Sequence, residues 1–215
     1  MSKSIGEIRV GGDVVLKGPL TFDIINVAGS LKIEGDAKGG EISASGRAVF
    51  LGNLKADECS FAGSIKAEGV IECSDLSVAG EGRFSNLVKA DEIHFSGRIW
   101  SERIECDEGH FSGDLSLKYV MCDEVFIEKE SKVSGVIIGE EVLIGRKAEV
   151  DDVYGTDVVI GSDVKANIVE GVDVKIGDGT RINEVRYVKD VKIGPSAKVR
   201  SLKKIDELSR KPGYS

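Results

Sequence analysis

A short phrase recurs through this chain at a nearly constant step of 16 or 17 positions. In the first half it is an apolar residue, a small or polar residue and a glycine, as in Val27-Ala28-Gly29 and Phe61-Ala62-Gly63, and in the second half it becomes Ile-Gly, as in Ile160-Gly161. A period this short and even means that the chain returns to the same place after each repeat. The first residues of the phrases form one apolar column: Val10, Val27, Ala44, Phe61, Val78, Phe95, Phe111, Ile127, Ile144, Ile160, Ile176 and Ile193.

The residues within each repeat predict strands. Apolar and polar positions alternate with a period of two, which is the spacing of a half-buried strand. Glycine and other small residues fall between the strands, where the chain turns a corner. Each strand returns to the same place in every repeat, so it pairs in parallel with the equivalent strand of the preceding repeat. The sequence therefore predicts an all-β, single-stranded parallel β-helix of triangular cross-section, with about twelve coils.

This repeat also predicts the domain limits. The β-helix is expected over residues 5–201, after a short N-terminal tail at residues 1–4. The pattern stops in the C-terminal tail, residues 202–215, where Leu202, Ile205 and Leu208 recur at a spacing of three. That spacing predicts a short helix lying over the last coil, because an uncapped solenoid end exposes unpaired strand edges.

Composition narrows the class of protein. The chain is 41% hydrophobic and 31% charged, which is apolar enough for a core. Its net charge of −8 argues against a nucleic-acid partner. We find no apolar run long enough to cross a bilayer and no apolar stretch near Met1, so we expect a cytoplasmic protein.

The cysteines and histidines both favour structural roles over chemistry. The four cysteines fall on predicted core columns and lack C-x-x-C spacing, so we expect unpaired thiols acting as small buried hydrophobes: Cys59, Cys73, Cys106 and Cys122. His94 and His110 occupy equivalent places in adjacent repeats, in one outward column. Together with nearby carboxylates they could hold a divalent metal. We favour the interpretation that His94 and His110 are exposed polar residues whose positions are set by the fold. We expect no metal, no cofactor and no catalytic residue.

Two segments resemble the bactofilins: Leu54-Lys55-Ala56-Asp57-Glu58-Cys59-Ser60-Phe61-Ala62-Gly63-Ser64-Ile65 and Val88-Lys89-Ala90-Asp91-Glu92-Ile93-His94-Phe95-Ser96-Gly97-Arg98-Ile99. Both follow that family's repeat phrase, and the resemblance covers residues 5 to about 120. It implies a right-handed β-helix and a cytoskeletal scaffold that joins end to end into filaments without a nucleotide. It also implies association with a membrane and partners that are membrane-associated or cell-envelope proteins.

The later coils offer a competing resemblance. Ile138-Gly139 and Ile144-Gly145, followed by Val150, are similar to the hexapeptide phrase of the left-handed β-helix acyltransferases. A coil of those enzymes comprises three whole hexapeptides, which is longer than the step of 16 or 17 kept here. Both histidines, His94 and His110, lie before these coils, and we see no cleft-forming insertion beside them.

Three functional hypotheses follow. The first is a non-enzymatic scaffold that assembles with copies of itself through its terminal coils, using Ile5, Ile8, Val10 and Phe22 at one end and Val188, Val191, Ile193 and Val199 at the other. The second is a discrete oligomer that acts as an adaptor through a lateral apolar patch of outward residues: Met121, Phe126, Ile138, Leu143, Tyr154, Val159 and Tyr187. That patch is equally compatible with a surface covered by the C-terminal tail or by the insertion near residues 128–135. The third is an acyltransferase-like enzyme.

Overall fold

The protein is an all-β parallel solenoid of about twelve coils, which confirms the predicted fold class. The computed structural model describes residues 3–213, and within that range it contains no helix. Accordingly, no helix in this range is long and apolar enough to span a membrane. The chain divides between Glu105 and Cys106 into two compact units.

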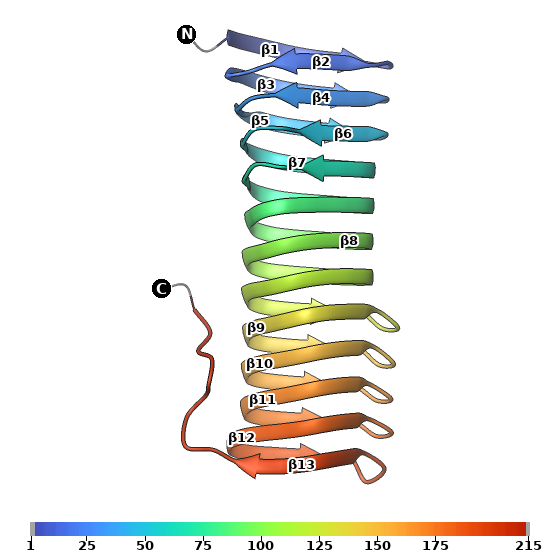
Figure 1. The fold of residues 1–215 in the computed structure, drawn as a ribbon, viewed down its shortest axis with the longest axis vertical. Coiled ribbons are helices and arrows are strands. Elements are labelled where there is room, and N and C mark those ends of the chain that lie inside the picture. Colours follow the sequence, from blue (N-terminus) through green and yellow to red (C-terminus); the bar gives the residue numbers. More distant parts are fainter. Residues whose placement is uncertain (1–2, 214–215) are drawn as a thin grey trace. The chain divides into compact units, whose positions relative to one another are not determined.

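Parallel strands make up both units (Figure 1). The first unit contains β1 (Lys3–Val10), β2 (Val14–Lys17), β3 (Leu20–Val27), β4 (Ser30–Glu34), β5 (Ala37–Ala44), β6 (Arg47–Phe50) and β7 (Leu54–Ala67). The long strand β8 (Ile71–Ile127) begins in the first unit and ends in the second. The second unit continues with β9 (Lys132–Ile144), β10 (Glu149–Ile160), β11 (Lys165–Ile176), β12 (Arg181–Ile193) and β13 (Lys198–Lys204).

In the first unit, equivalent residues pair at the predicted step of 17. Ile8 pairs with Ile25 and Ile25 with Ile42, and the same column continues through Cys59 to Leu76. From Ile25 onward these side chains are almost completely buried. The apolar columns that define the repeat therefore form the core.

Glycines make the corners of the first unit. Gly63, Gly80 and Gly97 have φ angles of 118°, 125° and 115°, in the region that L-residues avoid. Successive corners also approach closely, since a Cβ on Gly63 would lie 2.3 Å from the carbonyl oxygen of Gly46. Only glycine satisfies both conditions, which explains why glycine recurs at the same place in each of these coils.

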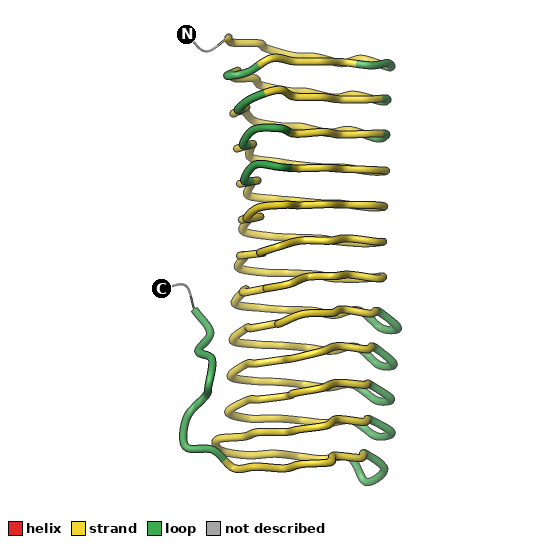
Figure 2. The backbone as a smooth tube through the Cα atoms, viewed as in Figure 1, coloured by secondary structure: helices red, strands yellow, loops and turns green. Residues whose placement is uncertain are grey.

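After β8 the second unit uses a different corner, a turn that projects from each coil (Figure 2). In three of these turns the left-handed position is held by a residue other than glycine, with φ angles near 60° at Glu130, Lys147 and Asp163. The next residue points inward and is buried, as at Ala148 and Val164. In part of this unit the step shortens to 16, so that Gly139 pairs with Gly155 and Gly155 with Gly171.

Two disulfides contradict the expectation of unpaired thiols. Cys59 bonds to Cys73, and Cys106 bonds to Cys122, with Cα–Cα distances of 6.5 and 4.5 Å. The predicted burial is confirmed, since all four side chains are at most 6% exposed. The pairing arises because parallel coils bring core columns of neighbouring repeats within disulfide reach.

The C-terminal tail also differs from its prediction. Strand β13 continues to Lys204, which pairs with Tyr187, so Leu202 belongs to the sheet. Residues 205–213 form no helix. The segment that remains is too short for a helix to be stable in isolation. Instead of lying over the last coil, it runs back beside β12, β11 and β10 (Figure 1). At the other end, Lys3 and Ser4 already belong to β1, and the remainder of the predicted N-terminal tail lies outside the described residues.

Candidate functional site

The first coil exposes core residues that are covered in the coils after it. Among residues 3–213, strand β1 pairs only with β3, and Val10 faces Val27 in that register. Val27 is completely buried, whereas Val10 is 39% exposed. Ile5 and Ile8 are half-buried, and Phe22, one coil further in, is buried. The apolar core of the first unit therefore reaches the surface at β1.

The last coil shows the same exposure. Ile193 pairs with Ile176 and Val191 with Val174, both on β11. In residues 3–213 no strand pairs with the other side of this part of β12. Ile193 is 38% exposed against 5% for Ile176, and Leu202 is 48% exposed. Val188, Val191 and Val199 are half-buried.

Part of the predicted lateral patch is covered. Tyr154 and Ile138 face outward in adjacent coils and pair with each other, yet they are only 4% and 1% exposed. The guanidinium of Arg210, in the C-terminal tail, lies 4.8 Å from the centre of the Tyr154 ring. Burial is the main cause of the raised pKa of the Tyr154 hydroxyl. The tail thus lies on this part of the patch.

The other patch residues lie in two places. Phe126, Leu143 and Val159 form a second outward row, in which Leu143 is 44% exposed and the other two are half-buried. Met121 is half-buried and pairs with Ile138. Tyr187 pairs with Gly171 instead of continuing the row of Tyr154, so its assignment to that row is wrong.

A buried carboxylate anchors the tail, and this was missed in the sequence. Glu170 is completely buried although it occupies an outward position in the row of Tyr154. Its Oε2 accepts hydrogen bonds from the Ser209 hydroxyl, at 2.8 Å, and from Arg186 Nη1, at 3.2 Å. Its Oε1 accepts a hydrogen bond from the backbone N–H of Ser209. The one signal was a glutamate in the outward row that begins with the apolar residues Ile138 and Tyr154.

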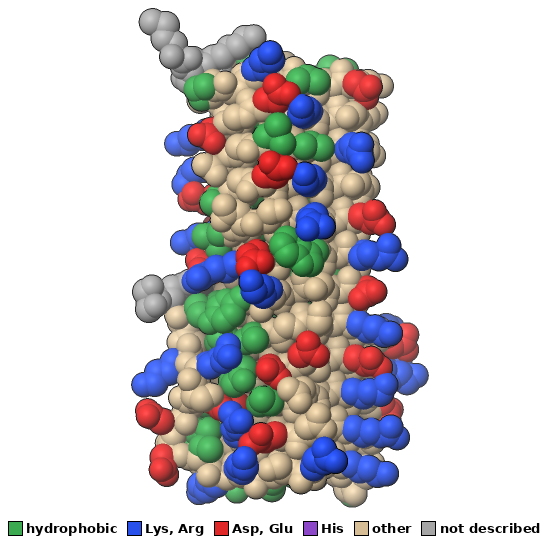
Figure 3. All heavy atoms as spheres, viewed as in Figure 1, with side chains coloured by type: hydrophobic (Ala, Val, Ile, Leu, Met, Phe, Trp, Pro, Cys, Tyr) green, Lys and Arg blue, Asp and Glu red, His purple; other side chains and the backbone are tan. Residues whose placement is uncertain are grey.

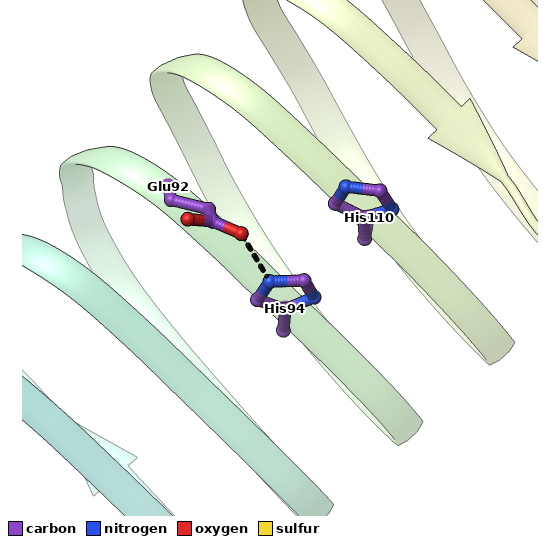
Figure 4. Close-up of side chains that lie close together, drawn as sticks. All are labelled: Glu92, His94 and His110. Carbon is purple, nitrogen blue, oxygen red and sulfur yellow. Dashed lines mark hydrogen bonds and ion pairs between the residues drawn. The ribbon is translucent and has the colours of Figure 1, made fainter.

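Each histidine is paired with a carboxylate two residues earlier in its own strand. His94 Nε2 lies 2.6 Å from Glu92 Oε1 (Figure 4), and His110 Nε2 lies 2.8 Å from Glu108 Oε1. The His110 ring also stacks on Phe126, with centroids 4.7 Å apart. His94 is exposed and His110 is half-buried.

Charged side chains follow the edge that carries the turns of the second unit. Figure 3 shows Lys and Arg recurring along that edge with acidic residues between them. The row runs through Lys132, Glu149, Lys165, Arg181 and Lys198. Lys165 bonds to Glu149 and lowers the pKa of that carboxyl. The charges of this row therefore partly neutralise one another.

A groove of the second unit includes Lys132, Glu149 and Lys165 of this charged row in its lining. It has a volume of about 430 Å³ and is lined by polar side chains that bond to one another along the coils. Asn183 Nδ2 donates to Asn167 Oδ1 at 3.1 Å, and Asn167 Nδ2 donates to Asp152 Oδ1 at 2.7 Å. These hydrogen bonds between the side chains of Asn183, Asn167 and Asp152 join neighbouring coils.

By its fold the chain is a parallel β-solenoid whose core reaches the surface at its first and last coils. No family model matches the sequence, and no curated protein or solved structure matches it either.

Proposed function

We propose that this protein is a non-enzymatic, bactofilin-like scaffold that assembles end to end into filaments without a nucleotide. The observation that carries the proposal is the exposure of core columns at the terminal coils. Val10 and Ile193 are more exposed than Val27 and Ile176, and in the described part of the chain β1 and the end of β12 each have an unpaired edge. The repeat phrase shared with the bactofilins points the same way.

The mechanism is the same pairing that joins coil to coil within the chain. A further copy docked on a terminal coil satisfies unpaired backbone N–H and C=O groups and covers the exposed apolar side chains. Covering the exposed part of one such side chain contributes about 1 kcal/mol, at about 25 cal/mol per Å². Several side chains at each end act together with the backbone, so no nucleotide is required.

The course of the C-terminal tail supports this proposal. A tail folded over the last coil would block docking there. The tail instead leaves β13 and bonds to the side of the stack, where Ile205 donates to the carbonyl of Tyr187 and Ser209 donates to Glu170. Leu202 and Ile193 therefore stay accessible.

The proposal is tested by placing a charge on the terminal coils. Ile5→Glu and Ile193→Glu each introduce a carboxylate at a docking surface, and we expect sedimentation velocity to show loss of large assemblies in both. Leu143→Glu is the matched control, because Leu143 is similarly exposed but lies away from the last coil. Large assemblies that persist in both terminal variants would contradict the proposal.

The exposure of Leu143 supports a second candidate, a discrete oligomer that binds a partner through the row of Phe126, Leu143 and Val159. The same variants separate the two candidates. An adaptor keeps its oligomeric state in the Ile5→Glu and Ile193→Glu variants, and its association through this row is lost in Leu143→Glu.

A further inference from the structure

The C-terminal tail covers part of one continuous row of outward residues in the second unit. Register places Ile138 beside Tyr154, Tyr154 beside Glu170, Glu170 beside Arg186, and Arg186 beside Lys203. Outward strand positions are normally exposed, but Ile138, Tyr154 and Glu170 are at most 4% exposed. We call this row, from Ile138 to Lys203, the covered row.

Two residues of the tail hold the cover in place. Ser209 supplies two of the three hydrogen bonds to Glu170, one from its backbone N–H and one from its hydroxyl. Arg210 supplies the cation over the Tyr154 ring. A buried carboxylate needs such donors, and if the tail leaves, water replaces them. The cover is therefore held by polar contacts that can exchange with solvent, and the coils beneath it do not depend on it for their pairing.

The exposed row would be complementary to a second copy of itself. Consider two copies side by side, related by a two-fold axis that passes between Glu170 and Arg186. In that arrangement Glu170 of each copy meets Arg186 of the other, and Tyr154 of each meets Lys203 of the other, because the residues are evenly spaced by one coil. The second copy thus supplies the same chemistry as the tail, namely donors to Glu170 and a cation over Tyr154.

We propose that the C-terminal tail is a releasable cover over a lateral self-association surface, and that Glu170 is its latch. The occupant of the surface, once the tail is released, is the covered row of a second copy. This contact is separate from the docking of terminal coils and does not depend on it. Tail release would thereby convert single solenoids or single filaments into laterally paired ones.

The test uses the full chain with the substitution Ile193→Glu, which keeps end-to-end assembly from obscuring lateral pairing. To this parent we add Ser209→Ala and Arg210→Ala, which change the tail and leave every residue of the coils intact. We expect trypsin to cleave after Lys204, where the tail leaves β13, at least tenfold faster than in the parent. We also expect sedimentation velocity to show dimers at concentrations where the parent is monomeric.

Two further variants make the result specific. Tyr154→Lys, added to the released variant, is expected to restore the monomer, because it places an ammonium group opposite Lys203 of the other copy. Lys211→Ala, which removes a tail cation that pairs with Glu207 of the same tail, is expected to behave like the parent. Unchanged cleavage in the Ser209→Ala/Arg210→Ala variant would overturn the latch. Faster cleavage with unchanged mass would overturn the self-association surface.

Discussion

At the scale of single residues, the fold of the first unit depends on positions where no side chain fits. Gly63 combines a φ of 118° with a backbone approach that leaves no room for a Cβ. The same geometry recurs at Gly80 and Gly97, one coil apart each time. These glycines let the coils stack at strand spacing while the chain turns.

Gly63→Ala is expected to destabilise the protein by about 1–3 kcal/mol, since the new methyl group meets the Gly46 carbonyl oxygen and the backbone conformation is unfavourable for alanine. The free energy of unfolding from urea denaturation measures the effect. Gly11→Ala is the control, because a Cβ there has no atom within 4 Å. Equal stability of the two variants would show that close stacking of corners does not constrain this fold.

Regular pairing made the core residues predictable. Similar residues recur every 16 or 17 positions because each strand pairs with its equivalent in the next coil. Residues that are one repeat apart in the sequence therefore lie side by side in the structure. The same rule could have revealed Cys106 and Cys122, which are one coil apart. Cys59 and Cys73 were harder to predict, because their separation of 14 joins two different columns.

The tail and Tyr187 were not predictable from the period. Ser209 contacts Glu170 across 39 residues, and no repeat connects a tail to a coil. Tyr187 is displaced because β12 has one residue more than β11 at this point. Tyr187 lies three residues before Asp190, whereas its pairing partner Gly171 lies two residues before Asp173. One extra residue in β12 is enough to move Tyr187 out of the row of Tyr154. The sequence alone does not show whether the extra residue lies before or after Tyr187.

At the scale of elements, Glu184 joins the last two strands. Its Oε1 accepts hydrogen bonds from Arg186 Nε, at 3.1 Å in β12, and from Lys203 Nζ, at 2.6 Å in β13. These bonds, together with the nearby positive charges, lower the pKa of Glu184 from 4.5 to about 2. The carboxylate is therefore ionised, and bonded to β13, over most of the acidic range.

The lowered pKa predicts how this contact depends on pH. A carboxyl group whose pKa is depressed in the folded state stabilises that state above its unfolded value of 4.5, and the contribution is lost as pH falls through about 2. Glu184→Gln is thus expected to lower the thermal unfolding midpoint at pH 5, with a difference from the unsubstituted chain that shrinks towards pH 2. Glu140→Gln, at an exposed glutamate, is the control. A difference that stays constant from pH 5 to pH 2 would contradict the assignment.

At the scale of the whole molecule, the protein presents two kinds of surface. The terminal coils expose core residues and unpaired strand edges, and we propose that they join copies end to end. The covered row is closed by the tail, and we propose that it joins copies side by side after release. Assembly in the two directions would then be controlled separately, the first by the terminal coils and the second by Ser209 and Arg210.

Negative-stain electron microscopy of the purified protein, without nucleotide and over a range of protein and salt concentrations, tests end-to-end assembly most directly. We predict filaments one solenoid wide in the unsubstituted protein and in Leu143→Glu, and short particles in Ile5→Glu and Ile193→Glu. Short particles alone in the unsubstituted protein, at every concentration, would contradict end-to-end assembly.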